Sequence, residues 1–582
     1  MYGQAEPRRL STDVLVIGTG GAGLRAAIAI ADRGLRVLVV GKRPKTDAHT
    51  VLAAGGINAA LGTMDPQDTW QIHAADTLAE GRYLGDPRAI DILCREAPRA
   101  VEELVDYGVP FAREANGVLS QRYFGAHRYR RTCFVGDYTG QEIIHALVRE
   151  VDRRQIPILE RVYISHLLTA GERANGALGF MLDGGREVIV HAAAVILATG
   201  GHIHVYQRSS SRRRENTGDG MALAFGVGAV LADMELVQFH PSGMVWPPEL
   251  EGTLVTEAVR GEGGRLLNQQ GERFMGRYDR ERMELSTRDR VALANYTEIV
   301  AGRGTAHGGV WLDVSHLPAA TIHARLPHML EQFAAIGVDI THEPMEVAPT
   351  AHYSMGGIQV TPATHATRVP GLFAAGEVTA GVHGANRLGG NSLAEILVFG
   401  RIAGEHAAEL AATETAPPLD EAALEQKRLT NRVLTGLDGT VQRGLIDDLQ
   451  RTMWQGAGVV RDAAGLEEAL ERLAVLRHEA EATPSGPADL AAALDLRSML
   501  LTAEATVRSA LLRTESRGAH QRRDYPATDP AWQRTVVVCP RLTDEGPHTG
   551  LTLATEAIAD PAPEVSAVLD ATELAVAGRL VE

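Results

Sequence analysis

The chain has 582 residues, of which 45% are hydrophobic and 22% are charged, so it can bury several cores and is not expected to be disordered. Its 73 acidic and 57 basic side chains give a net charge of −16, which argues against a general nucleic-acid binder, because such proteins neutralise phosphates. The three cysteines, Cys94, Cys133 and Cys539, lie far apart, form no disulfide framework and are too few for a four-cysteine iron–sulfur cluster.

The hydrophobic pattern predicts no direct membrane insertion. The longest uncharged apolar run, Met221 to Ala232, is shorter than the roughly 18 residues that a membrane-spanning helix needs. Residues 1–11 contain no apolar stretch typical of a signal peptide. We therefore expect a globular protein that lies in the cytoplasm.

The N-terminal segment predicts an alternation of strand and helix. Asp13–Gly18 reads as a buried strand that ends in a glycine turn, Gly23–Arg33 as an Ala- and Ile-rich helix, and Leu35–Val40 as a second strand. This order is typical of an α/β fold with a parallel, doubly wound, Rossmann-like sheet.

Two later segments have the same strand-to-glycine form, Val195–Gly201 and Gly371–Glu377. Because they lie so far apart, we expect an α+β capping domain to interrupt the nucleotide-binding domain between about Val237 and Thr350. The expected domains are a nucleotide-binding domain in two parts (1–237 and 351–410), a capping domain (238–350), a helical domain (420–515) and a small C-terminal region (516–582).

The last third of the chain predicts helices after a linker at Ala411–Asp420. Apolar residues on a single face indicate one helix. A second helix is expected from Ala488 to about Leu512, and Pro484–Pro487 should break the chain between the two. The final 60 residues are rich in turn residues, with a strand candidate at Thr535–Cys539. The residues on the apolar face of the first helix are Leu466, Ala469, Leu470, Leu473 and Leu476.

The glycine turn after the first strand carries a dinucleotide fingerprint. Gly18, Gly20 and Gly23 have the spacing that allows a tight turn, a close approach to a pyrophosphate and close packing of helix on strand. The pyrophosphate would bind the free N–H groups at the N-terminus of the helix. After the second strand the chain has Lys42 and no acidic residue for a ribose. This disfavours a plain NAD site and leaves open FAD bound with different ribose contacts.

The segment Asp47–Asn58 places His49-Thr50-Val51 before Gly55-Gly56. A histidine before an apolar stretch is by itself more often packed or exposed than functional. Together with the fingerprint, however, this segment resembles the flavoprotein subunit of succinate dehydrogenase and fumarate reductase. The resemblance implies that His49 carries a covalent bond to the 8α-methyl carbon of FAD, although Ala54 stands where relatives commonly have Gln or Glu.

Further polar clusters follow in the order of that family, and the resemblance extends from about residue 12 to 527. Each cluster alone is compatible with a turn cap or a structural ion pair. Together with the fingerprint and the His49 segment, they favour a catalytic site. The clusters are Gln238–Gly243, Thr256–Gly264, Glu284–Asp289, Ala351–Gly357, Gly384–Gly389 and the segment Arg513–His520 with Asp524–Pro526.

The resemblance implies a small dicarboxylate, succinate or fumarate, as substrate. Arg387 would clamp one carboxylate, and other polar groups would hold and polarise the opposite end, namely His352, His240 and Ser242. The resemblance assigns the proton shuttle to Arg288 and the relay to solvent to Glu257 and Arg260. Since arginine has a pKa above about 12, this acid–base role comes from the resemblance alone.

The same resemblance implies the contacts to FAD and no metal ligands. The expected FAD-binding residues are those of the glycine turns, polar groups on several strands and helices, and His49 itself. They are Gly18, Gly20, Gly21, Gly23, Lys42, His49, Thr50, Gly55, Gly56, Ala198, Thr199, Gly200, Asp219, Glu377, Arg387, Ser392 and Leu393.

The resemblance also implies an external electron partner, because the chain lacks the cysteines for its own cluster. We expect an iron–sulfur subunit that connects the chain to a membrane anchor, with the chain peripheral on the cytoplasmic face of the inner membrane. L-Aspartate oxidase, which lacks a histidine at the His49 position, and a soluble fumarate reductase are the alternatives. A pyridine-nucleotide reductase would need paired cysteines, and a non-catalytic flavin scaffold would have lost the polar clusters.

Overall fold

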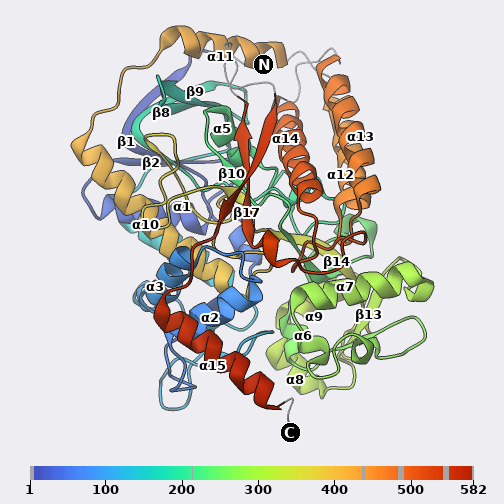
Figure 1. The fold of residues 1–582 in the computed structure, drawn as a ribbon. Helices are drawn as coiled ribbons and strands as arrows, with labels where there is room; N and C mark the ends of the chain where they lie inside the picture. Colours follow the sequence, from blue (N-terminus) through green and yellow to red (C-terminus); the bar gives the residue numbers. More distant parts are fainter. Residues whose placement is uncertain (1–4, 213, 435–438, 483–489, 542–549, 580–582) are drawn as a thin grey trace.

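The computed structural model describes residues 5–212, 214–434, 439–482, 490–541 and 550–579 (Figure 1). Its central sheet grows from the predicted strand–helix–strand unit at the N-terminus. In this sheet β1 pairs in parallel with both β2 and β9, and the strand order is β6-β2-β1-β9-β8-β7, with β16 beside β9. The strands are β1 (Arg8–Ile17), β2 (Val37–Gly41), β6 (Ile158–Glu160), β7 (Val162–Ala170), β8 (Arg173–Met181), β9 (Glu187–Leu197) and β16 (Leu372–Ala374).

Both faces of the sheet are covered, because the side chains of β1 alternate between two hydrophobic cores. Val14 and Val16 contribute to a core with four helices, whereas Leu15 and Ile17 pack on the opposite face with β7, β8 and α5. The four helices of the first core are α1 (Gly21–Ala31), α3 (Pro87–Asp106), α4 (Thr139–Arg153) and α10 (Asn391–Thr413). The other face carries α5 (Asp219–Gly226), and α2 (Trp70–Glu80) packs beside α3.

A second, antiparallel sheet is inserted before β16, with strand order β11-β14-β13-β12. With its helices it forms the lobe at the lower right of Figure 1. The expected boundaries 238–350 stay a prediction. The elements are β11 (Val237–Met244), α6 (Ala258–Gly261), β12 (Arg265–Leu267), α7 (Arg288–Glu298), β13 (Val310–Asp313), α8 (Ala319–Arg325), α9 (Pro327–Ala334) and β14 (Met345–Ser354).

Within the described residues, four helices lie between the linker and the C-terminal region, two more than the periodicity predicts. They are α11 (Glu421–Leu434), α12 (Gly439–Ala457), α13 (Ala463–Ala482) and α14 (Leu490–Leu512). The predicted apolar face of α13 lies in a core shared with α12 and α14, although Leu470 is only partly buried. The predicted break at Pro484–Pro487 lies outside the described residues. None of the helices in the described residues is long and apolar enough to cross a membrane.

The C-terminal region contains more regular structure than its turn-rich composition predicts. The predicted strand is present as β17 (Arg534–Pro540), in a sheet with order β15-β10-β17-β18. The helix α15 (Pro563–Arg579), which the sequence analysis missed, packs against α2 through the buried Val565 (Figure 1). The remaining strands are β3 (Ile57–Asn58), β4 (Gln121–Arg122), β5 (Thr132–Cys133), β10 (Leu231–Ala232), β15 (Gly357–Ile358) and β18 (Leu551–Ala557).

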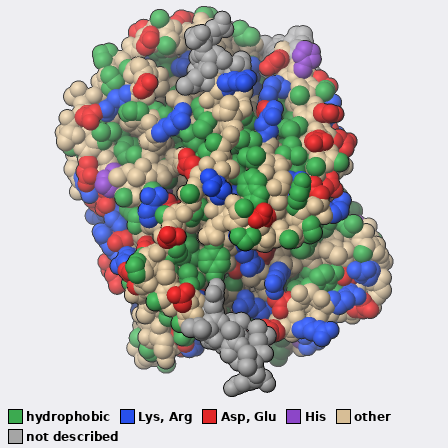
Figure 2. Space-filling model, in the orientation of Figure 1, with side chains coloured by type: hydrophobic (Ala, Val, Ile, Leu, Met, Phe, Trp, Pro, Cys, Tyr) green, Lys and Arg blue, Asp and Glu red, His purple; other side chains and the backbone are tan. Residues whose placement is uncertain are grey.

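The net negative charge does not collect in one area on the face drawn in Figure 2. Acidic and basic side chains are interspersed over this face, and hydrophobic side chains appear between them. This face therefore offers no patch of a single charge sign to an anionic ligand.

Candidate active site

The glycine turn between β1 and α1 has the geometry that the fingerprint predicts. Gly18 has φ +123°, and a Cβ placed there would lie 2.0 Å from the carbonyl oxygen of Ala198. A Cβ on Gly23 would lie 2.0 Å from the carbonyl oxygen of Gly18. Only glycine fits both positions, so α1 begins directly at the end of β1, with its N-terminal amides available to an anion.

A cavity extends from this turn to the inserted sheet. It brings together predicted FAD-binding and catalytic residues from many separate parts of the chain. Among the predicted residues, Gly23, Ser242 and Arg260 are the ones that do not line it. Lining residues that the sequence analysis missed include Thr19, Arg43, Phe124, Ser210, Glu215, Asn216, Thr256 and Tyr353.

At one end of the cavity Lys42 lies between two carboxylates. Its Nζ is 3.0 Å from Asp219 Oδ2 at the start of α5 and 3.3 Å from Asp495 Oδ1 in α14. Burial lowers the pKa of Lys42, but the two carboxylates outweigh burial and hold the pKa above its ordinary value. Asp495, a buried acid within an apolar helix, is a residue that the sequence analysis missed.

His49 lies at the first position of a short 3-10 helix, His49–Leu52. Thr50 Oγ1 accepts a hydrogen bond from the amide of Gly21 (3.2 Å), which ties this segment to the N-terminus of α1. His49 Nδ1 lies 3.3 Å from Glu215 Oε2. The structure therefore pairs the predicted attachment residue with a carboxylate that the sequence analysis did not select.

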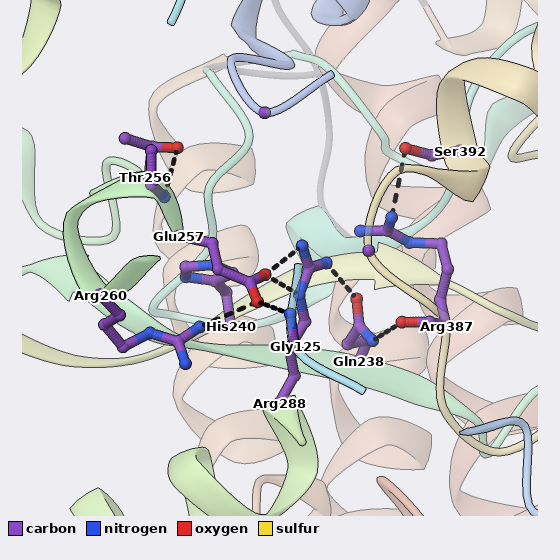
Figure 3. Close-up of polar contacts among 12 residues, drawn as sticks. Gly125, Gln238, His240, Thr256, Glu257, Arg260, Arg288, Arg387 and Ser392 are labelled. Carbon is purple, nitrogen blue, oxygen red and sulfur yellow. Dashed lines mark hydrogen bonds and ion pairs between the residues drawn. The ribbon is translucent and has the colours of Figure 1, made fainter. Parts of the chain in front are cut away.

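Arg288 is the first residue of α7 and lies between Glu257 and Gln238 (Figure 3). Its Nε donates to Glu257 Oε2 at 2.7 Å, and its Nη1 donates to Gln238 Oε1 at 3.1 Å. Gln238 Nε2 in turn donates to the carbonyl of Arg387 (2.9 Å). These bonds hold the guanidinium of Arg288 from two sides, so its orientation is set before any ligand binds.

The negative charge of the Glu257 carboxylate balances the positive charge of two buried guanidinium groups, those of Arg288 and Arg260. Glu257 Oε1 also accepts from the amide of Gly125 (3.2 Å) and lies 3.8 Å from Arg260 Nη2. Burial raises the pKa of Glu257, but the charges of Arg288 and Arg260 outweigh it and lower the pKa to about 2. Glu257 is therefore ionised at neutral pH.

Two histidines face each other beside this cluster. The rings of His240 and His352 are 5.1 Å apart in an edge-to-face arrangement. Burial lowers both pKa values well below the ordinary histidine value, and the charges of neighbouring arginines lower them further. The charge of His240 also lowers the pKa of His352. Both imidazoles are therefore neutral at neutral pH and can each donate one hydrogen bond.

The hydroxyl of Ser242 does not reach the cavity, unlike the expectation that it holds the substrate. Ser242 Oγ donates to the carbonyl of Val255 (3.0 Å), and the amide of Ser242 donates to His240 Nδ1 (3.3 Å). This places Ser242 behind His240, in the part of β11 where the pairing with β14 is irregular, between His240 and Gly243. Thr256 lines the cavity from the neighbouring segment instead.

Arg387 keeps unused donors in the cavity. Its Nη1 donates to Ser392 Oγ (3.2 Å), its guanidinium lies 4.3 Å from the ring centre of Tyr353, and its buried Nε has no partner in the described residues. Burial and the like charge of Arg288 lower its pKa to about 10, so it stays protonated at neutral pH. A carboxylate would pair with this buried charge.

The donor set also fits FAD. Thr199 Oγ1 and Asn216 Nδ2 are buried without a partner in the described residues, although both line the cavity. Glu377 is buried there too and accepts from the amide of Ser354 (3.0 Å). Unpaired buried polar groups along an elongated cavity that begins at a dinucleotide turn are the complement of a ligand with hydroxyls, a pyrophosphate and a polar ring.

Comparison with known proteins agrees with this site. The FAD binding domain family matches residues 13–393, and the fumarate reductase flavoprotein C-terminal family matches residues 446–559. A fumarate reductase (CoM/CoB) subunit of Methanothermobacter marburgensis is 47% identical over 90% of this chain and 96% of its own length. The succinate dehydrogenase flavoprotein subunit of Rickettsia bellii is 39% identical over 90% of this chain and 92% of its own length.

Solved structures show the same similarity. Mycobacterium smegmatis Sdh1 in complex with UQ1 is 42% identical, with a TM-score of 0.87 over 97% of this chain and 98% of that one. A flavoprotein chain of Escherichia coli quinol fumarate reductase is 33% identical, with a TM-score of 0.87 over 96% of this chain and 99% of that one. The chain therefore belongs to the family of FAD-dependent oxidoreductases formed by the flavoprotein subunits of succinate dehydrogenase and fumarate reductase.

Proposed function

We propose that this chain interconverts succinate and fumarate. The observation that carries the proposal is the pair of buried guanidiniums of Arg288 and Arg387, which face the same cavity. Gln238 joins the guanidinium of Arg288 to the main-chain carbonyl of Arg387. Two fixed positive charges with neutral hydrogen-bond donors beside them match a small dicarboxylate. Bound FAD supplies the hydride acceptor or donor at its ring.

The position of each polar residue in the cavity determines its role in substrate binding or proton transfer. Arg387 pairs with one carboxylate, while the neutral His240 and His352 donate hydrogen bonds to the other and favour negative charge that develops on it. Arg288 holds a proton near the substrate carbon that exchanges it. Glu257 accepts that proton and relays it toward solvent through Arg260, a buried residue whose Nη2 lies 3.8 Å from Glu257 Oε1 and which does not line the cavity.

A dye-linked assay of the purified chain tests this proposal. We expect fumarate to oxidise a reduced viologen dye and succinate to reduce an oxidised dye, with both activities lost in Arg288→Ala. Arg290→Ala is the matched control, because Arg290 lies on the same helix but is exposed and pairs with Asp279. Activity with L-aspartate instead of succinate, or equal activity in both variants, would overturn the proposal.

We further propose that FAD is attached covalently through His49. The position of His49 on the cavity wall, next to the segment that contacts the N-terminus of α1, supports this. After acid precipitation of protein from its own host, flavin fluorescence should stay in the pellet for the wild type and move to the supernatant for His49→Ser. Flavin in the wild-type supernatant would favour a soluble fumarate reductase or an aspartate oxidase.

The electron partner is proposed as a separate iron–sulfur subunit joined to a membrane anchor. The related solved structures are described as complexes with a quinone or quinol, which supports a multisubunit assembly. This chain would then be peripheral, on the cytoplasmic face of the inner membrane. Copurification of an iron-containing subunit with the tagged chain tests this, and recovery of the active chain without iron would contradict it.

A further inference from the structure

A buried carboxylate, Glu215, contacts the ring of His49. Glu215 Oε2 lies 3.3 Å from His49 Nδ1, and the side chain of Glu215 is 5% exposed. Both residues line the cavity that begins at the glycine turn. No described residue hydrogen-bonds to the other ring nitrogen, Nε2.

Two arginines hold Glu215 in place. Arg212 Nη2 is 2.6 Å from Glu215 Oε1, and the backbone amide of Arg212 donates to Oε2 (3.2 Å). Arg43 Nε is 3.1 Å from Oε1. Both arginines also bind Asp47, two residues before His49, so the cluster joins the segments 43–49 and 212–215.

We propose that Glu215 is a positioning residue for His49: it accepts the Nδ1–H and thereby leaves Nε2 as the nitrogen that bonds to the flavin. This inference rests on the proposed covalent attachment. A carboxylate that accepts from one nitrogen of an imidazole selects the tautomer, orients the ring and makes the other nitrogen more basic. The same arrangement is used where histidines act as bases or metal ligands.

The attachment reaction balances in atoms and electrons when fumarate is the oxidant. The bond between Nε2 and the 8α carbon forms, one methyl C–H bond breaks, and its proton leaves to solvent. The electron pair of that bond stays on the ring, which takes up one proton and is reduced by two electrons. Fumarate, the oxidant of the proposed function, accepts these electrons with two protons and becomes succinate. The imidazole gains a positive charge in this step, and Glu215 faces that charge.

Several charged groups act on His49, from its own segment and from those packed against it. Burial lowers its pKa, but the hydrogen bond and charge of Glu215, aided by Glu377 and opposed by Arg212, raise it above the ordinary value. His352 is also coupled to His49, since the charge of His49 contributes to lowering the pKa of His352. Since the attacking form is neutral, the rate of attachment should rise with pH through a midpoint above the ordinary histidine value.

The test measures covalent attachment rather than turnover. The full chain, prepared without flavin, is incubated with FAD and fumarate in an extract of its own host, which supplies any assembly protein. Covalent flavin is followed by fluorescence of the denatured chain on a gel, from about pH 6 to about pH 9. Flavin absorbance before denaturation reports FAD binding and thus folding. His49→Ser provides the background.

We expect Glu215→Gln to slow attachment by about 10-fold or more while it still binds FAD, as loss of an orienting partner does elsewhere. Its midpoint should also move to lower pH. Asp47→Asn is the matched control, because it removes a carboxylate from the same ion cluster without contacting His49, and it should attach FAD at the wild-type rate.

Two results would overturn the inference. One is an unchanged rate and midpoint in Glu215→Gln, and the other is equal slowing in Asp47→Asn, which would show that the cluster only holds the loop. If Glu215→Gln binds no FAD, Glu215→Asp replaces it: it keeps the charge but withdraws the oxygens from Nδ1, and a wild-type rate there would refute the positioning role. Absence of covalent flavin in the wild type would refute the attachment and the inference together, whereas succinate activity would still test the proposed reaction.

Discussion

Replacement of Glu257 by glutamine is the sharpest test of the proton relay. The substitution keeps the shape of the side chain but removes the negative charge that Arg288 and Arg260 share. The fall in the pKa of Glu257 from 4.5 to about 2 corresponds to about 3 kcal/mol of favourable interaction with the ionised form. Because Glu257 is ionised at neutral pH, the variant loses this interaction there.

Turnover should fall much more than substrate binding. Loss of the relay should lower kcat by about 100-fold or more, within the range attributed to general acid–base groups. The KM for fumarate should not rise, because removal of a negative charge leaves the cavity more positive. Initial rates with reduced viologen dye and with succinate plus an oxidised dye measure kcat and KM in both directions.

Glu284→Gln is the matched control. Glu284 is also a buried carboxylate in an ion pair, with Arg273 (2.6 Å), but it does not line the cavity. Its substitution should leave kcat within about 3-fold of the wild type, because its side chain bonds Arg273 and the amide of Leu266 and is no acid–base group of the relay. A Glu257→Gln variant with a kcat as high as this control, or with a raised KM and unchanged kcat, would refute the relay.

Three further predictions follow from buried charges. Arg387→Met should raise the KM for fumarate at least about 10-fold, because it removes the charge proposed to pair with a carboxylate. Steady-state rates measured over a range of fumarate concentrations give this KM, and an unchanged KM would contradict the prediction. The pH profile of kcat/KM should show no step near the ordinary histidine value, about 6.5, because His240 and His352 are already neutral there; a step that disappears in His352→Gln would contradict this. Glu80, which accepts from Asn386 Nδ2 at 2.6 Å, has its pKa raised to about 8 by burial and the charge of Asp289. The folded protein thus keeps this proton above pH 4.5 while the unfolded chain loses it, so stability falls as pH rises to about 8. Glu80→Gln should show a smaller fall in melting temperature from about pH 6 to about pH 8.5, and an equal fall would argue against a protonated Glu80.

Local patterns were enough to predict the elements whose partners lie nearby. The strand Asp13–Gly18, the turn and the following helix were found because alternation, glycine spacing and helical periodicity are all encoded within about thirty residues. The C-terminal helix α15 was missed, because its burial depends on α2, which lies near the other end of the chain. Its own apolar residues do not form a single face.

The sequence by itself determined which chemistry is present: a dinucleotide turn, a histidine before a glycine pair, and polar clusters that resemble one family. Only the tertiary structure decided which groups meet. It paired Lys42 with Asp495, His49 with Glu215 and Arg288 with Gln238, and it turned Ser242 away from the cavity. The physical reason is that side-chain identity is local, whereas burial and the charges that shift a pKa come from segments that only packing brings together.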